Sequence, residues 1–240
     1  MRRLLLSLLL LTQYLLPAFA QQDTSNLVRY TPDFRFKDGF YVNFEQVQKN
    51  DPIPKSRIVT SSDYNSRDFF NNVVENERIY FFDALGIRQE IEVSGLWGYS
   101  RNGILYRQLQ GNFHRITFVG KICHYVADIT TYDRGYSGGY PYGYYDPYYY
   151  SRYNSYNYYS PYGYNSPYRT TARSELKQFI IDFETGREVE YEPKNVEVMI
   201  MKDPELYDEY LQLSRKKKKQ MAFYFIRKFN EKHPLYLPKK

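Results

Sequence analysis

The chain has 240 residues, a formal net charge of +6, a single cysteine and 29 tyrosines. This mild positive charge is too small to mark a nucleic-acid-binding protein, and one thiol excludes an internal disulfide framework. Aromatic residues make up 19% of the sequence, which points to packing or binding.

Residues 1–20 have the pattern of a secretory signal peptide. Arg2 and Arg3 precede an apolar run from Leu4 to Leu11, and an Ala-Phe-Ala stretch ends at Ala20. The run is shorter than the roughly 20 residues that span a bilayer, so we expect cleavage near Ala20 rather than an uncleaved anchor. The mature protein is then extracytoplasmic: periplasmic, on the outer surface or secreted. We expect no transmembrane segment after signal removal and no nucleic-acid partner.

Composition and periodicity divide the remaining chain into five parts. They are a loose N-terminal lead-in (21–37), an antiparallel β core (38–131), a Tyr/Gly/Pro-rich low-complexity loop (132–168), a β hairpin and strand that complete the core (169–202), and C-terminal helices with a tail (203–240).

The clearest local signal is the Asn102-Gly103 pair between two runs rich in aromatic and aliphatic residues. Asn-Gly favours a tight hairpin turn because both turn positions need positive φ. We therefore expect paired strands at 93–100 and 104–109, in the middle of an antiparallel sheet.

The chain before this hairpin alternates between short elements. Asn43 is placed to cap a short helix at 44–49. The composition of 60–72, rich in Ser, Asn and Asp, favours loop. A strand at 78–82 is expected to turn at Gly86 and return over 87–93, where strict alternation predicts one buried and one solvated face.

After the hairpin, the pattern of 113–127 predicts one strand that is apolar on both faces. We expect it to be buried on both sides, with a helix covering one of them.

Residues 132–168 contain 16 of the 29 tyrosines and no Leu, Ile, Val, Met, Lys or Glu. Without aliphatic side chains there is little to build a core, and the Gly and Pro content opposes regular structure. We expect a long disordered loop between two strands, which a fold tolerates because loop-closure cost grows slowly with length.

In the C-terminal third of the chain, the spacing of apolar residues changes from the alternation of strands to the spacing of helices. A hairpin is expected around 184–186, and alternation of apolar residues at 196, 198 and 200 suggests another strand. Asp203 and Pro204 then mark the start of a helix. A second helical pattern ends at His233-Pro234, and 214–219 is either a junction between the helices or part of a continuous helix.

Together these elements predict an α+β fold: an antiparallel sheet, open or curled into a half-barrel, with the C-terminal helices packed on one face.

No catalytic motif of useful specificity is present, so no catalytic residue, cofactor or metal is predicted. His114, Cys123 and His124 match no standard zinc spacing, and the last two point to opposite faces of a strand. Cys123 is interpreted as a small buried residue, against an intermolecular bridge or a reactive thiol. Acids are plentiful, so a carboxylate-pair hydrolase stays open, although nothing selects a pair.

Two kinds of surface are candidates for binding. The aromatic residues of the hairpin either belong to the core or, where exposed, form a stacking platform for a ligand. Those in the loop offer weak multivalent contacts. The candidates are Trp97, Tyr99 and Tyr106 in the hairpin and Tyr142, Tyr148 and Tyr158 in the loop. A dense basic run is either a solvated helix end or a contact for an anionic surface; it comprises Arg215, Lys216, Lys217, Lys218 and Lys219.

Five blocks of the sequence stand out, at 38–45, 80–86, 96–106, 120–125 and 225–236. They resemble uncharacterised exported proteins of Bacteroidetes-type bacteria, and the likeness extends over most of the mature chain apart from the loop. The resemblance implies an envelope location and no assigned activity.

These observations favour a non-enzymatic exported protein that binds a cell-envelope component or a partner protein, with the Tyr-rich loop as the contact region. The alternatives are an enzyme acting on an envelope polymer and a structural protein that self-associates through the loop.

Overall fold

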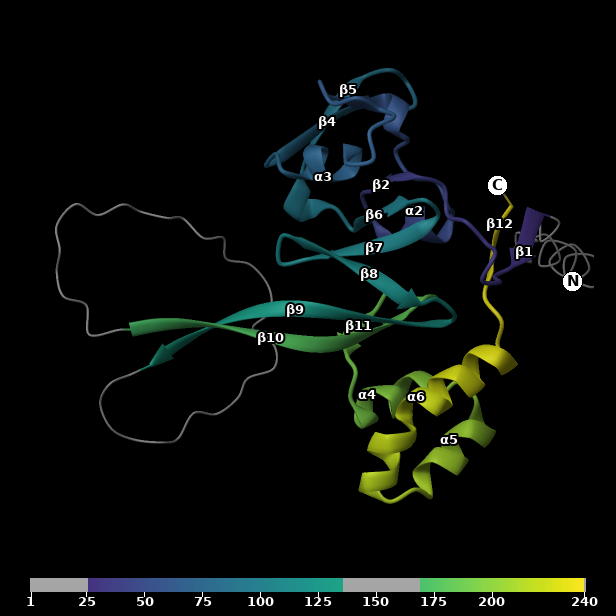
Figure 1. Cartoon of the computed structure of the whole chain (residues 1–240). Coiled ribbons are helices and arrows are strands. Elements are labelled where there is room, and N and C mark those ends of the chain that lie inside the picture. The colour runs from purple at the N-terminus through teal and green to yellow at the C-terminus, as the bar shows by residue number, and fades with distance from the viewer. Residues whose placement is uncertain (1–25, 136–168, 240) are drawn as a thin grey trace, which may run out of the picture.

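The computed structural model describes residues 26–135 and 169–239, with side chains described for 26–131 and 173–239 (Figure 1). The expected signal peptide and most of the Tyr-rich loop lie outside these ranges. The first half contains β1 (Leu27–Arg29), β2 (Gly39–Tyr41), α2 (Phe44–Gln48), η3 (Lys55–Arg57), β3 (Ile58–Val59), α3 (Phe69–Val74), β4 (Arg78–Phe82), β5 (Arg88–Glu92), η4 (Val93–Gly95), β6 (Gly98–Arg101), β7 (Ile104–Leu109) and β8 (Asn112–Phe118). The second half contains β9 (Ile122–Gly135), β10 (Arg169–Asp182), β11 (Glu188–Glu190), α4 (Pro193–Ile200), α5 (Pro204–Leu211), α6 (Arg215–Lys232) and β12 (Tyr236–Pro238).

The α+β class is confirmed. Over the described residues, seven strands form one antiparallel sheet in the order β11-β10-β9-β8-β7-β6-β2. Arg107 on β7 and Glu188 on β11 form an ion pair of 2.7 Å. Four strand spacings separate them, about 19 Å in a flat sheet, so the sheet must be strongly curled. It curls without closing, and α2 bridges its two ends by placing Phe44 against Phe183.

The Asn102-Gly103 turn is confirmed, because both residues have positive φ, at 53° and 75°. The predicted position of this hairpin in the middle of the sheet is wrong. β6 lies next to the edge strand β2, and β4 and β5 join β3 in a separate three-stranded sheet. The first strand of the hairpin also starts later than expected, since 93–95 form the short helix η4.

The return strand β5 only half follows its alternation. Of the residues predicted on the buried face, Ile91 in β5 is half-buried and Val93, which belongs to η4, is buried, but Ile87, just before β5, is 54% exposed. β5 is the edge of the small sheet, so little of the molecule covers that end of the predicted buried face.

The prediction of one strand over 113–127 is wrong, because the segment is the hairpin of β8 and β9. Gly120 lies at the turn, where an added Cβ would come within 2.4 Å of the Asn230 side chain. Burial of both faces is confirmed at the base of β9: Cys123 and Tyr125 lie in one apolar cluster, and Ile122 lies in the other with the helices.

Two segments that were predicted as a loop and as a strand are helical in the structure. The end of the predicted loop at 60–72 belongs to α3, which buries Phe69, Phe70 and Val73 at helical spacing. The strand expected at 196–200 is α4, with Pro193 in its first turn, and Val198 on its outer side is 46% exposed.

The first C-terminal helix begins at the cap that the sequence predicted, and the segment 214–219 begins a second, separate helix instead of continuing the first. The Asp203 side chain accepts a hydrogen bond from Leu206 N at the start of α5, and Ser214 caps α6. Both helices pack with α4 on the outer face of the curled sheet (Figure 1).

The predicted lead-in contains structure as well. β1 pairs with β12 from Leu27↔Pro238 to Arg29↔Tyr236, so the two ends of the described chain lie side by side (Figure 1). Phe36, further along, is only 3% exposed.

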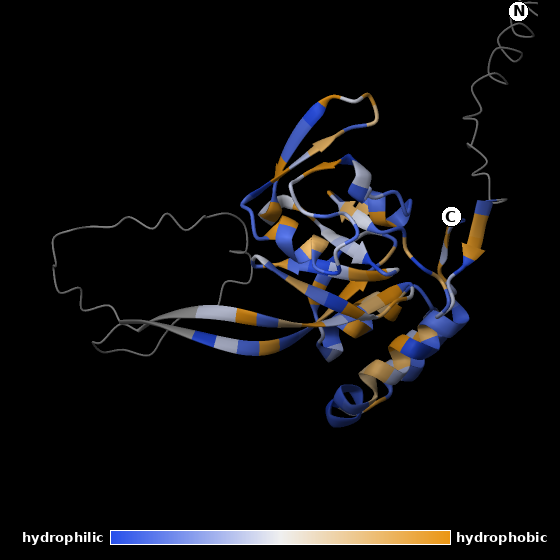
Figure 2. Cartoon of the chain, turned by 45° about the horizontal axis from the view of Figure 1, so that its top comes forward, coloured by the Kyte–Doolittle hydropathy of each residue, from blue (hydrophilic) through white to orange (hydrophobic). Residues whose placement is uncertain are grey.

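The longest feature is the two-stranded β9–β10 ribbon. Its ladder runs without a break from Ile122↔Asp182 to Gly135↔Arg169, about 45 Å at 3.3 Å per residue. β8 and β11 pair only with its base. Figures 1 and 2 show from two directions that the far end stands clear of the rest of the molecule.

Candidate functional site

The three aromatic residues of the central hairpin lie in or against the core instead of on the surface. Trp97 is 9% exposed and Tyr99 is 5% exposed, and Tyr106 is half-buried. Tyr99 stacks on Phe70 and Tyr106, with ring centroids 4.9 and 4.8 Å apart. With its ring in these contacts, Tyr99 lies in the core, which is one of the two interpretations that the sequence allowed.

Trp97 is held by its neighbours. The Arg107 guanidinium lies over the Trp97 ring at 5.5 Å and donates a hydrogen bond to the Trp97 carbonyl oxygen at 2.8 Å. Because the same guanidinium pairs with Glu188, this contact joins the hairpin to the far end of the curled sheet.

Tyr142, Tyr148 and Tyr158 lie outside the described residues. The structure does establish where their segment is attached. Gly135 and Arg169 are direct cross-strand partners at the far end of the ribbon, so the two ends of the segment are adjacent there.

The basic run divides into two parts. Lys218 forms a 2.7 Å ion pair with Glu197 and lies over the Tyr210 ring, so it joins α6 to α4 and α5. The other four cations are exposed and have no ion pair with any described residue; they are Arg215, Lys216, Lys217 and Lys219. We call these four residues the basic surface. It occupies the first turns of α6, where the positive end of the helix dipole disfavours cations.

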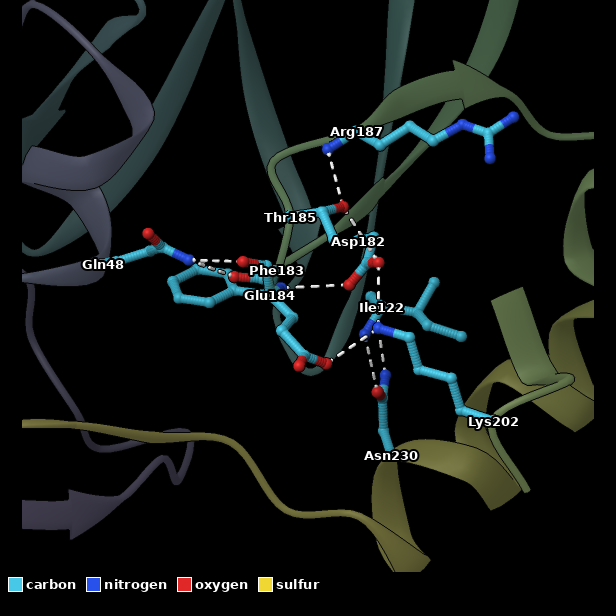
Figure 3. A network of polar contacts seen from close by, with 9 residues as sticks. All are labelled: Gln48, Ile122, Asp182, Phe183, Glu184, Thr185, Arg187, Lys202 and Asn230. Carbon is cyan, nitrogen blue, oxygen red and sulfur yellow. Dashed lines mark hydrogen bonds and ion pairs between the residues drawn. The ribbon is translucent and has the colours of Figure 1, made fainter. Parts of the chain in front are cut away.

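A network of polar contacts surrounds the turn between β10 and β11 (Figure 3). The Asp182 carboxylate accepts hydrogen bonds from the Glu184 N–H and the Thr185 hydroxyl, each at 3.0 Å. Lys202, which follows α4, lies 3.1 Å from Asp182 and 2.8 Å from Glu184. From the other side, Gln48 donates to the carbonyl oxygens of Phe183 and Glu184.

The electrostatics of this turn keep both acids ionised. Burial raises the pKa of the Asp182 carboxyl, but hydrogen bonds from Glu184 N–H, Lys202 and Thr185 outweigh it and bring the pKa below its usual value. The hydrogen bond and charge of Lys202 also lower the pKa of Glu184. Neither carboxyl is therefore suited to donate a proton at neutral pH. The adjoining cavity, of about 120 Å³, is small for a ligand site.

Asn230 on α6 completes the network. Its side chain accepts from Ile122 N and donates to Ile122 O, both at 2.8 Å. This two-point contact fixes α6 to the start of β9, and the network as a whole joins sheet, α2 and helices.

Asp203 and His233 form a second buried polar contact, with 2.6 Å between His233 Nε2 and Asp203 Oδ2. The Asp203 side chain is 4% exposed, and Lys232 Nζ lies 3.0 Å from it. Burial raises the pKa of Asp203, but hydrogen bonds from His233, Lys232 and Leu206 N–H prevail and lower it to about 2. This pair joins the end of α6 to the start of α5.

Cys123 is 1% exposed, and its thiol donates to the Gly120 carbonyl oxygen. Burial raises the pKa of the thiol to about 12, which keeps it neutral and unreactive at neutral pH. In the part of the chain that the structure describes, no three His, Cys, Asp or Glu residues gather closely enough to hold a metal ion.

One hollow was not foreseen. A cavity of about 390 Å³ lies between the lead-in and strands β7 and β8 of the sheet, and its charged lining residues are Arg35 and Arg115. Nothing in the sequence pattern signals it, because it forms only when the lead-in lies against β7 and β8.

Comparison with protein-family models, curated proteins and solved structures finds no match. Among the described helices, none has the length and apolar character to cross a membrane.

Proposed function

We propose that this chain is an exported, non-enzymatic protein that binds a cell-envelope component or a partner protein through its Tyr-rich segment. One observation carries the proposal. The β9–β10 ribbon continues well beyond the strands that flank its base and ends at the Gly135↔Arg169 pair. It therefore holds both ends of the segment together, away from the body of the molecule.

The chemistry of the segment suits this position. Tyrosine combines an apolar ring with a hydroxyl group and loses little conformational entropy on contact. Sixteen copies in 132–168 supply repeated weak contacts whose avidity exceeds that of any single one. The paired strands of the ribbon also bring the two ends of the loop together before any partner binds, so the entropy of loop closure is not lost on binding.

The basic surface of α6 supports a second contact of the same protein, with an anionic component. Its four cations have no counter-charge among the described residues, so an anionic partner meets no competing ion pair there.

The test is co-sedimentation of the mature protein with cell-envelope fractions. The decisive variant replaces 136–168 with Asn-Gly, a two-residue turn that fits between the paired residues Gly135 and Arg169. We expect the wild type to sediment and the variant to stay in solution while keeping its circular dichroism spectrum and melting temperature.

A graded control changes Tyr142, Tyr148 and Tyr158 to Ser. Because avidity is shared among many rings, we expect partial loss of sedimentation from this triple variant. Equal sedimentation of the wild type and the deletion variant contradicts the proposal and assigns binding to another surface.

A further inference from the structure

Part of the outer edge of β10, the edge that faces away from β9, has no described strand paired with it. β11 pairs with β10 only at 179–181, with one further hydrogen bond from Tyr191 N to the Gln178 carbonyl oxygen. From Arg173 to Lys177 no described strand lies on this side. Since backbone groups of alternate residues face the same side of an antiparallel strand, Leu176 and Ser174 direct their N–H and C=O groups to this open edge, as Gln178 does to β11. Unpaired strand edges of this kind are templates for another strand.

The side chains along the open edge are self-complementary. Arg173 and Glu175 lie on one face of the strand and form an exposed ion pair of 3.2 Å. Leu176, on the other face, is 78% exposed. A strand of sequence Arg-x-Glu can pair antiparallel with its own copy so that each arginine lies opposite a glutamate.

We propose that the open edge of β10 pairs with the same edge of a second copy of this chain, about a twofold axis at Ser174. In this register Arg173 lies opposite Glu175 of the partner subunit, and the reciprocal pair forms as well. The result joins two ribbons into one four-stranded sheet, which relieves the marginal stability of an isolated two-stranded ribbon in water.

Neighbouring registers fit less well. An axis at Leu176 extends the second strand along the whole of 179–181, where β11 already pairs, and past Gln178, whose carbonyl oxygen already accepts from Tyr191. The axis at Ser174 brings only the first residues of the partner strand, 169 and 170, to that point. An axis at Ala172 places Arg173 opposite a threonine, Thr171 of the partner subunit. The axis at Ser174 places Arg173 and Glu175 opposite each other in both reciprocal pairs, within the free part of the edge. An axis at Ala172 instead places Glu175 opposite Arg169 of the partner subunit, at the end of the strand.

The test is sedimentation velocity of the full mature chain. We expect it to form a weak dimer with a dissociation constant of roughly 1–100 µM, because pairing of one strand edge buries little surface. Arg173→Glu and Glu175→Arg each place like charges opposite one another across the edge. We expect each variant alone to raise the dissociation constant at least about tenfold.

An equimolar mixture of the two variants is the decisive sample. One chain then carries two glutamates and the other two arginines, so both cross-edge pairs are attractive while the pair within each chain stays broken. We expect the mixture to form a heterodimer with affinity within about threefold of the wild type. A mixture as monomeric as its components overturns the proposal, as does a wild type that is monomeric at about 100 µM.

Two controls distinguish pairing at this edge from association through another part of the molecule. Arg78→Glu makes the same charge change at an exposed ion pair on β4, and we expect its dimer to match the wild type. The variant with 136–168 replaced by Asn-Gly is expected to dimerise too. Loss of the dimer in that variant overturns the edge pairing and favours self-association through the Tyr-rich segment, whatever the outcome with envelope fractions.

Discussion

At the scale of single residues, Asp203 shows how one carboxylate serves two helices. It caps α5 and accepts from His233 and Lys232 at the end of α6, and its pKa is lowered to about 2 from an ordinary value of 3.8. A carboxyl whose pKa is lower in the folded than in the unfolded state stabilises the fold above the unfolded value. That contribution disappears as pH falls through the folded value.

We therefore expect Asp203→Asn to lower the urea midpoint of unfolding at pH 6, and this deficit to shrink as pH falls from about 4 to 2. Urea titrations across this range, read by circular dichroism, measure it. Glu45→Gln, at an exposed ion pair, serves as the control with little effect at any pH. A deficit that stays constant down to pH 2 contradicts the role given to this carboxylate.

Gly120 and Asn230 are coupled by contact. A Cβ on Gly120 would lie 2.4 Å from Asn230 Nδ2, and Asn230 makes both hydrogen bonds to Ile122. We expect Gly120→Ala to cost about 1–3 kcal/mol through overpacking and Asn230→Ala about 1–3 kcal/mol through the unpaired backbone groups of Ile122.

The double variant distinguishes coupling from two separate effects. When the side chain at position 230 is shortened, the methyl group added at position 120 has room. The double variant is therefore expected to lose less stability than the sum of the single variants. Chemical denaturation of the four proteins gives the coupling free energy. Strict additivity contradicts the contact.

The roles of some of these residues were predictable from the sequence, and those of others were not. Asp203 was found because a cap residue before proline is a local signal. Asn230 was not, because an asparagine inside a helix gains its role from Ile122, which is distant in the sequence. Tyr99 was open between core and an exposed platform for a similar reason, since the contact with Phe70 of α3 that buries its ring joins segments distant in the sequence.

At the scale of elements, the start of α6 concentrates unpaired positive charge. Four cations there have no ion pair with a described residue. We expect a protein that starts at residue 21 to bind vesicles containing anionic lipid in low salt. Changing Arg215, Lys216, Lys217 and Lys219 together to Gln is expected to weaken this binding by roughly one to three orders of magnitude, at up to about 1 kcal/mol per contacting cation.

A matched control removes the same charge from exposed positions elsewhere, by changing Arg57, Arg67, Arg187 and Lys194 to Gln. Vesicle flotation at 50 and 300 mM salt measures both variants. Equal weakening in the two variants would show that net charge alone, and not the basic surface, governs binding.

Elements with a local signature were predicted well. The turns at Gly103 and Gly186 have the positive φ that their sequences indicate, and α5 begins at the predicted cap, Asp203. The segment at 196–200 was assigned to the wrong class because Val196, Val198 and Ile200 alternate by chance within a helix whose buried residues are Val196, Met199 and Ile200.

At the scale of the whole molecule, the fold class followed from the sequence but its curvature did not. Local patterns predict strands and turns, whereas the Arg107–Glu188 contact across the curled sheet depends on how seven strands twist together. The full length of the ribbon was also missed, because residues 132–135, the last pairs of β9, were assigned to the Tyr-rich loop.

The pairing of β1 with β12 bears on the order in which the chain assembles. β12 follows every other described element, so β1 stays without its partner until all of them have been synthesised. Contacts between such distant segments are slow to form because the intervening chain must first be ordered. The last step of folding is therefore expected to secure the two ends against each other, and a nascent chain remains open at its N-terminal side until then.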